Sequence, residues 1–321
     1  MARKHKPVQL WETPKILQAL HLLYSEEVRV SGTGVCAVLH MDEIVINGAH
    51  AMVDIERLKT VIIQAAEQEL LPRFSSGERG EKLDGSVITE ADMAMQSRLR
   101  ADLAAQWPDF PLLGEEMDEA SQQRMLQNNA TALWCVDPLD GTSNFAAGVP
   151  FFSVSVALLD KGLPVVGVVY DPVRRECFWA MPGKGAWCND TRLSARGLDL
   201  SLSQAVALVD FKRLDAALAR RLAEQPPYSS QRSFGSVALD WCWIAAGRGH
   251  VYLHGKQRIW DYAAGSLILA EAGGHAATLA GEAVYHADIA PRSAVAALDE
   301  GMFQAWCAWL AMPQGIADTL P

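Results

Sequence analysis

The stretch Trp134–Phe152 reads WCVDPLDGTSNFAAGVPFF, and the fold and function of the chain are predicted outward from it. The apolar run 132–136 just before its acids predicts a buried strand. The run leads into Asp137–Asp140, which places two carboxylates three residues apart at a strand end. Gly141 permits a tight turn, and a helical turn starting at Gly141-Thr142 would direct backbone N–H groups toward an anion. In isolation the acids would equally suit a turn around a proline. Together with the anion-binding backbone they suggest divalent cations between the acids and a phosphate.

DPLDGTSNF, over Asp137–Phe145, resembles the signature of the inositol monophosphatase family of magnesium-dependent, lithium-sensitive phosphatases. That family also includes fructose-1,6-bisphosphatases and 3'-phosphonucleotide phosphatases. Three further stretches agree with it: KLDGSVITEAD from Lys82 to Asp92, Gly114-Glu115-Glu116, and WDYAAG followed by EAGG within 260–274. The resemblance spans roughly residues 52–298. It implies an α/β fold, the layered α-β-α-β-α sandwich of the sugar-phosphatase type, with metals at the junction of two halves.

The chain is expected to divide into three parts. Residues 1–50 form an N-terminal extension that precedes the resemblance. Residues 51–190 form an α+β half with most of the acids, and 191–321 form an α/β half with Asp261 and substrate contacts. One hypothesis is that the extension is not part of the folded protein and that natural translation begins at Met41 or Met52.

Composition narrows the class of protein. The 321 residues are 50% hydrophobic, enough for a large core, and the formal net charge of -10 disfavours nonspecific nucleic-acid or anionic-membrane binding. The 6 cysteines are scattered without a C-x-x-C pair, which favours reduced thiols over zinc or redox motifs. There is neither an apolar run of about 18 to 20 residues nor a signal-peptide core. We therefore expect a cytoplasmic protein without a membrane or nucleic-acid partner.

Local patterns predict several elements. A helix is expected from about Asp54, its N-cap, to Leu71. Thr89 is expected to cap a second helix, with Asp92 completing a pattern close to a capping box. Asp261 is expected at the N-cap of a helix closed by two glycines. The remaining expectations are a short strand at 111–113, an exposed polar insertion at 117–129 and an antiparallel meander within 152–180.

Four acids carry the predicted metal chemistry: Glu115, Asp137, Asp140 and Asp261, with the Leu139 carbonyl. A set of hard oxygen donors without His or Cys favours Mg2+, with Mn2+ also possible. The resemblance implies two or three ions in each site and assigns Glu115 to bridging them.

The resemblance also assigns catalytic and substrate roles. Asp92 and Thr142 would orient the attacking water, with Glu115 as the third catalytic residue and no phosphoenzyme. Phosphate and substrate contacts are expected from Gly141, Thr142, Ser236, His254 and the loop lysine Lys82. Without the resemblance, Asp92, Asp261 and Ser236 would all suit helix caps and Lys82 would suit a solvated loop.

Two departures put the inositol assignment in doubt. His254 replaces a glutamate that binds sugar hydroxyls in inositol-selective members, and Ala147 replaces a common histidine. The predicted activity is Mg2+-dependent hydrolysis of small phosphomonoesters, first of all polyol phosphates like inositol 1-phosphate. The alternatives are a 3'(2'),5'-bisphosphate nucleotidase, a histidinol-phosphatase, or a non-catalytic regulatory protein on the same fold. Family members are commonly homodimers, so a homodimer is expected.

Overall fold

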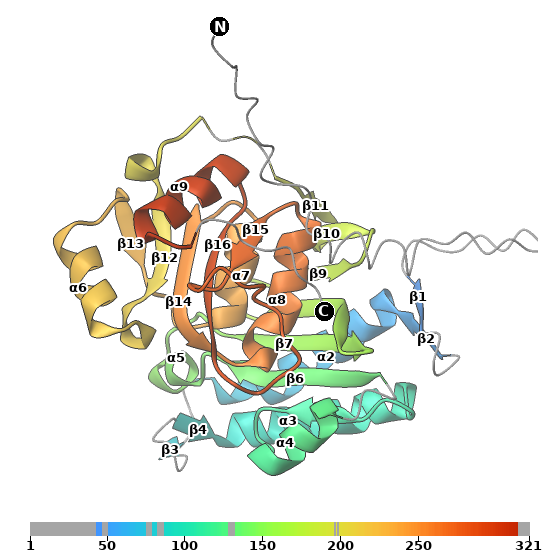
Figure 1. The fold of residues 1–321 in the computed structure, drawn as a ribbon. Coiled ribbons are helices and arrows are strands. Elements are labelled where there is room, and N and C mark those ends of the chain that lie inside the picture. Colours follow the sequence, from blue (N-terminus) through green and yellow to red (C-terminus); the bar gives the residue numbers. More distant parts are fainter. Residues whose placement is uncertain are drawn as a thin grey trace, which may run out of the picture.

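Two large β-sheets and three layers of helices make up the fold, and two short two-stranded pairs, β1 (Glu43–Ile46) with β2 (Ala51–Asp54) and β3 (Arg79–Glu81) with β4 (Val87–Thr89), add to it (Figure 1). The structure, a computed structural model, describes residues 43–46, 51–74, 79–81, 87–127, 132–195, 197 and 199–313. The seven-stranded sheet has the order β11 (Thr191–Leu193), β10 (Gly185–Cys188), β9 (Glu176–Met181), β8 (Leu163–Asp171), β7 (Ser153–Asp160), β6 (Leu133–Asp140) and β5 (Leu112–Gly114). Its neighbours pair antiparallel except β5 and β6, which run parallel.

The second sheet has five strands: β13 (Ser230–Arg232), β12 (Val206–Asp210), β14 (Val251–Gln257), β16 (Arg292–Ala297) and β15 (His275–Ala277). β12 runs parallel to both of its neighbours, and the other pairs are antiparallel. Strand β11 pairs with β10, so the first sheet extends past the predicted boundary at residue 190.

Helices form three layers around these sheets. The outer face of the first sheet is covered by α2 (Ile55–Glu69) and α3 (Glu90–Gln106). The space between the sheets is filled by α7 (Val237–Ala245) and α8 (Ile259–Glu271), and the second sheet is covered by α6 (Ala216–Glu224) and α9 (Glu300–Leu310). The predicted α-β-α-β-α sandwich is therefore confirmed. The shorter elements are β1 (Glu43–Ile46), β2 (Ala51–Asp54), β3 (Arg79–Glu81), β4 (Val87–Thr89), α4 (Glu119–Gln127), α5 (Thr142–Ala147) and the 3-10 turns Leu71–Arg73, Leu202–Gln204 and Phe211–Arg213.

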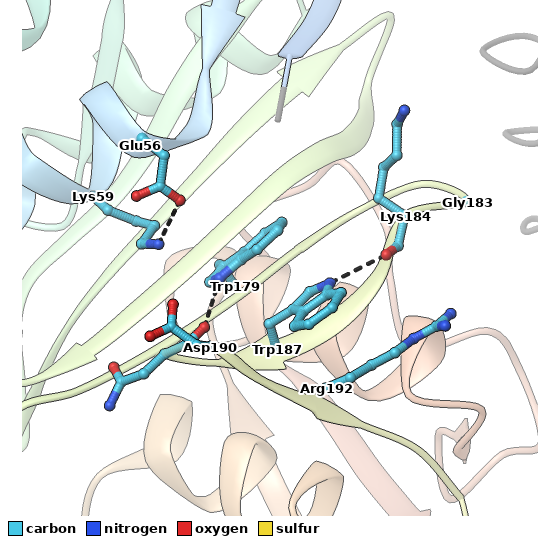
Figure 2. Close-up of a pocket in the computed structure, with 9 residues that line it drawn as sticks. Glu56, Lys59, Trp179, Gly183, Lys184, Trp187, Asp190 and Arg192 are labelled. Carbon is cyan, nitrogen blue, oxygen red and sulfur yellow. Dashed lines mark hydrogen bonds and ion pairs between the residues drawn. The ribbon is translucent and has the colours of Figure 1, made fainter. Parts of the chain in front are cut away.

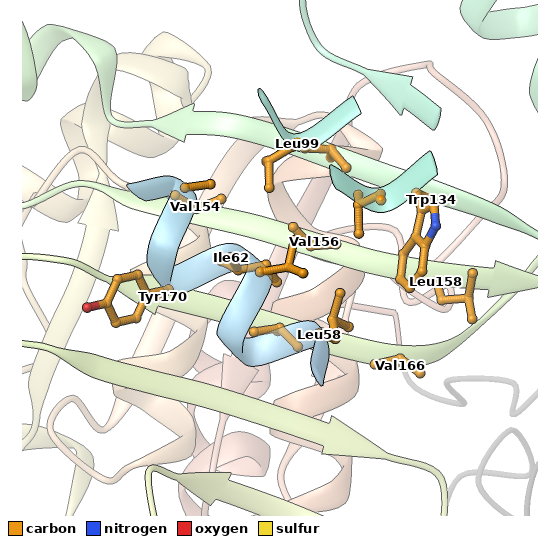
Figure 3. Close-up of a cluster of buried hydrophobic side chains, with 14 of the residues drawn as sticks. Leu58, Ile62, Leu99, Trp134, Val154, Val156, Leu158, Val166 and Tyr170 are labelled. Atoms are coloured by element: carbon orange, nitrogen blue, oxygen red, sulfur yellow. The ribbon is translucent and has the colours of Figure 1, made fainter. Parts of the chain in front are cut away.

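Side chains alternate along the central strands and so contribute to the hydrophobic cores on both faces of the first sheet. On β6, Trp134 and Val136 point into the core under α2 and α3, while Leu133 and Cys135 point toward α7 and α8. Successive side chains of a strand face opposite ways, and here both faces are covered. Figure 3 shows the first core, where Leu58 of α2 lies against the sheet.

Two glycines allow close contact at α8. A Cβ on Gly167 of β8 would lie 2.8 Å from the Ala264 carbonyl oxygen, and one on Gly265 would lie 2.5 Å from the Trp241 Cβ of α7. Helix α8, which carries Asp261, is thus held at backbone distance from the first sheet and against α7.

Most of the predicted elements are confirmed. The Asp54 side chain accepts hydrogen bonds from the N–H groups of Glu56 and Arg57 at the start of α2. The meander is β7, β8 and β9. The segment expected to be an exposed polar insertion at 117–129 forms α4 over Glu119–Gln127, and the prediction of exposure is wrong at the buried Gln122 and Leu126. Residues 128 and 129 lie outside the described residues.

Part of the predicted N-terminal extension belongs to the described fold. β1 pairs with β2 in antiparallel register, and the Ile44 and Ile46 side chains are buried in the first core. A chain starting at Met52 would lack β1, whereas one starting at Met41 would keep it. None of the helices in the described ranges has the length and apolar character that a bilayer span requires.

Candidate active site

Parallel pairing of β5 and β6 brings the first two acidic segments together. Gly114 is in register with Val136, and the Glu115 N–H donates to the Val136 carbonyl at 3.1 Å. Glu115 therefore leaves β5 beside Asp137 of β6, because parallel strands end at the same edge of a sheet.

The central motif is more extended than the sequence predicts. Strand β6 continues through Asp140, with a register shift against β7 between Asp137 and Asp140. Irregular pairing of this kind re-aims side chains near functional sites. Gly141 then takes a left-handed φ of 97°, and α5 begins at Thr142, as the sequence predicts.

Asp92 and Thr142 lie in direct contact. The Asp92 Oδ2 accepts hydrogen bonds from the Thr89 N–H at 2.7 Å and the Thr89 Oγ1 at 2.6 Å, so the predicted capping box is confirmed. The Thr142 Oγ1 lies 3.0 Å from both the Asp92 Oδ1 and the Leu139 carbonyl oxygen. One hydroxyl thus joins the start of α3 to the central motif.

Asp261 lies one turn deeper in its helix than predicted. The N-cap of α8 is Arg258, whose N–H donates to the Asp261 Oδ2 at 2.7 Å, and Asp261 is the third helical residue. The predicted N-cap assignment is therefore wrong, although the carboxylate still serves the helix start. Ser155 of β7 donates to the Trp260 carbonyl at 2.9 Å and ties this turn to the first sheet.

Asp140 caps a helix of the other half. Its carboxylate accepts from the Val237 N–H at 3.0 Å, the Ala238 N–H at 2.7 Å and the Ser236 Oγ at 2.5 Å, all at the start of α7. Ser236 occupies the backbone N-cap position but makes no side-chain cap bond of its own, and it is fully buried. Its side chain therefore lies against Asp140 and Ser153.

Burial and mutual repulsion raise the pKa values of the acids. Burial, followed by the charges of Glu115, Asp140 and Asp261, holds the pKa of Asp137 well above its usual range. Burial, then Asp140 and Glu115, does the same for the pKa of Asp261.

Asp140 and Asp92 follow the same pattern with more hydrogen bonding. Burial raises the pKa of Asp140 to about 6, although the three donors at α7 oppose the rise. Burial raises the pKa of Asp92 against the hydrogen bonds from Thr89 and Thr142, and Glu115 adds to it. The charge of Glu115 thus acts on all four other acids, and because Coulomb energy falls with distance, the five converge in one region.

The chemistry of this donor set suits a hard divalent cation. The main influences on Asp137 and Asp140 include no basic side chain among the described residues, and on Asp261 the charge of Arg213 opposes the rise only as the last of its causes. Oxygen donors without His suit Mg2+ or Mn2+. Within the described ranges, however, no three His, Cys, Asp or Glu side chains already stand in an arrangement that would hold an ion.

The predicted substrate residue His254 has its own acidic partner outside this group. His254, in β14, is buried, and its Nε2 lies 3.3 Å from the Asp210 Oδ2 of the neighbouring strand β12. Sequence reasoning missed Asp210, which ends β12 and is partly exposed. Lys82 lies outside the described residues.

A cavity of about 550 Å³ lies elsewhere, beside the far edge of the first sheet (Figure 2). Its floor is the stacked pair Trp179 and Trp187, whose ring centroids are 5.7 Å apart, and Lys59 lies over the Trp179 ring. None of the predicted site residues lines this cavity. Cavity size alone would thus point away from the acidic cluster.

Two glutamines beside Glu115 were missed by sequence reasoning. Gln122 of α4 donates to the carbonyls of Gly114 and Glu115, and Gln96 of α3 accepts from the Glu116 N–H. No motif marks either residue. Only the 3.6-residue period, which puts Gln96 one turn after Asp92 on the same face of a helix, could have drawn attention to it.

The layered sandwich, with acids at the ends of β5 and β6 and at the starts of α3 and α8, places the chain among the α/β proteins. Residues 51–310 match the inositol monophosphatase family, and the chain belongs to that family. Among its relatives, "Nus factor SuhB" of Pasteurella multocida is 37% identical over 199 residues, 60% of this chain and 72% of the relative. "Inositol monophosphatase 1" of Solanum lycopersicum is 37% identical over 194 residues, 59% and 71% of the two chains. The solved structure of the extragenic suppressor protein suhB from Bartonella henselae superposes with a TM-score of 0.66 at 29% identity, covering 80% of this chain and 97% of that one.

Proposed function

We propose that this protein is a Mg2+-dependent phosphatase of small phosphomonoesters. The observation that carries the proposal is the convergence of four acids: Glu115 leaves β5 beside Asp137 of β6, and its charge raises the pKa values of the buried Asp137, Asp140 and Asp261. The relative named as an inositol monophosphatase supports the reaction class.

Each residue then has a role. Glu115, Asp137, Asp140, Asp261 and the Leu139 carbonyl would hold Mg2+, two or three ions in each site. Bound there, the ions would neutralise phosphate charge and supply an activated water. Asp92, aligned by Thr89 and Thr142, would accept a proton from that water and orient it toward phosphorus. The N–H groups of Gly141 and Thr142 would hold phosphate oxygens. No protein nucleophile is needed.

For the substrate, we propose polyol phosphates such as inositol 1-phosphate first, with 3'(2'),5'-bisphosphate nucleotides and histidinol phosphate as competitors. The buried His254–Asp210 pair supports no direct His254 contact with a sugar, so Asp210 enters the candidate list for substrate contacts. We also propose lithium inhibition and a homodimer, on the family alone.

A phosphate-ester panel with and without Mg2+ tests the reaction. The parent should release phosphate only with Mg2+, and D137N should lose about 100-fold or more, because one charged oxygen donor is removed from the cation site. D118N changes an exposed acid at the start of α4 and keeps an acceptor for the Ser121 N–H, so this variant is the matched control. Equal phosphate release by the parent and D137N would contradict the proposal.

A second candidate is a non-catalytic regulatory protein, because the relative from Pasteurella multocida is named as a factor and not by a reaction. Retained partner capture by D137N and D261N, together with a parent inactive on every ester, would favour this candidate. Loss of activity in both variants from an active parent would favour the phosphatase.

A further inference from the structure

We propose that Gln96 and Gln122 are positioning residues that clamp the Gly114–Glu116 turn and thereby aim the Glu115 carboxylate. The inference rests on the proposed function, in which Glu115 holds cations. It concerns two side chains from different helices, one on each side of the turn.

Gln122 holds the carbonyl side of the turn. Its Nε2 donates to the Gly114 oxygen at 2.9 Å and to the Glu115 oxygen at 3.1 Å, and the residue is only 3% exposed. These two carbonyls flank the Glu115 Cα in the chain. A single amide group therefore fixes the peptide planes before and after the residue that carries the carboxylate.

Gln96 holds the opposite side. Its Oε1 accepts from the Glu116 N–H at 3.2 Å, and it is 7% exposed. A Cβ on Gly114 would lie 2.1 Å from this same oxygen, so the clamp closes only over a glycine. Because Gln96 lies one helical turn after Asp92, α3 places both Asp92 and the clamp on Glu115.

The amide groups suit this place electrostatically. A lysine or arginine here would bring positive charge to the acids and compete with a cation, and a carboxylate would add repulsion. An amide supplies both donor and acceptor without formal charge. Groups that orient a ligand in this way typically change metal affinity or activity by about 10- to 100-fold when removed.

The test measures metal binding by calorimetry with Mg2+ and by electron paramagnetic resonance with Mn2+, and turnover beside it. We expect Gln122→Leu to weaken metal binding by about tenfold or more, with an unchanged far-ultraviolet circular dichroism spectrum. Gln123→Leu, at the exposed neighbouring position of α4, should bind metal like the parent. Gln96→Met, which removes the acceptor, should shift affinity in the same direction as Gln122→Leu.

A double-mutant cycle with Glu115→Gln separates positioning from general loosening. If Gln122 acts through Glu115, Gln122→Leu adds nothing to the loss of affinity in the Glu115→Gln background. Additive losses would overturn the inference, as would parent-like binding by folded Gln122→Leu and Gln96→Met, or failure of both to fold. A parent that binds no metal and turns over no ester would instead refute the proposed function.

Discussion

Asp92 serves two purposes with one carboxylate. Its Oδ2 closes the capping box at Thr89, while its Oδ1 meets the Thr142 hydroxyl. Burial raises its pKa, which moves the group toward the range in which it can accept a proton near neutral pH. In the proposed mechanism the residue would combine this structural contact with the role of a general base.

Replacing Asp92 by Asn should separate these purposes. Asn keeps an acceptor for Thr89 but has no charge, so we expect kcat to fall by about 100- to 10,000-fold while the melting temperature does not fall. Single-turnover rates at saturating Mg2+ and thermal unfolding measure the two effects. Glu90→Gln, an exposed acid in the same helical turn, is the control. Parent-like turnover by D92N would remove Asp92 from the mechanism.

At this scale the sequence motifs pointed to Asp92 and Thr142, and the structure brings the two side chains into contact. The sequence could not predict the partners of other site residues. Asp140 accepts hydrogen bonds from Ser236, Val237 and Ala238, nearly a hundred residues later in the chain. No sequence pattern around Asp140 or at the start of α7 predicts this contact. The partner of Gln122 is likewise a backbone carbonyl, in a turn that comes to lie beside Gln122 only when the chain is folded.

At the scale of whole elements, the accuracy of the predictions depends on where each helix begins and on how its residues pack. The sequence predicts a helix after Trp260, but the choice between N-cap and third position for Asp261 needs the backbone bond from Arg258. Helix α4 was missed because its residues are mostly polar and only Gln122 and Leu126 are buried. Strongly patterned elements such as α2 were predicted well, since their apolar face and their cap agree.

Gly167→Ala should show how tightly α8 is seated. The added methyl would meet the Ala264 backbone at 2.8 Å, so we expect the free energy of unfolding to fall by about 1–3 kcal/mol. Metal affinity should fall as well, because α8 carries Asp261. Gly197→Ala is the matched control, since a Cβ there meets nothing within 4 Å. Urea unfolding of both variants measures the change, and equal stability would mean that α8 can move aside freely.

For the whole molecule, the raised pKa values make stability depend on pH and on cations. A buried acid with a folded-state pKa above its unfolded value binds protons more tightly when folded, so its unfavourable contribution grows as pH rises. For Asp140 this window runs from the ordinary carboxyl pKa of about 4 to about 6. Asp137 and Asp261 shift in the same direction and extend the window upward.

We therefore expect the metal-free protein to lose stability as pH rises from about 4 through about 6 and beyond, and Mg2+ to offset the loss above that range. Thermal unfolding across pH, with and without Mg2+, measures both effects. Stabilisation by Mg2+ that is equal at both ends of the range, or larger at the acidic end, would contradict this. NaCl at matched ionic strength controls for general screening.

The structural role of Asp140 matters when the activity of a family member is inferred from its sequence. Asp140 ends a strand of the first sheet, and its carboxylate accepts hydrogen bonds from the first N–H groups of α7. Selection for a foldable chain would preserve that aspartate even in a descendant that had abandoned chemistry. The presence of this aspartate is therefore weak evidence that a member of the family still turns over substrate.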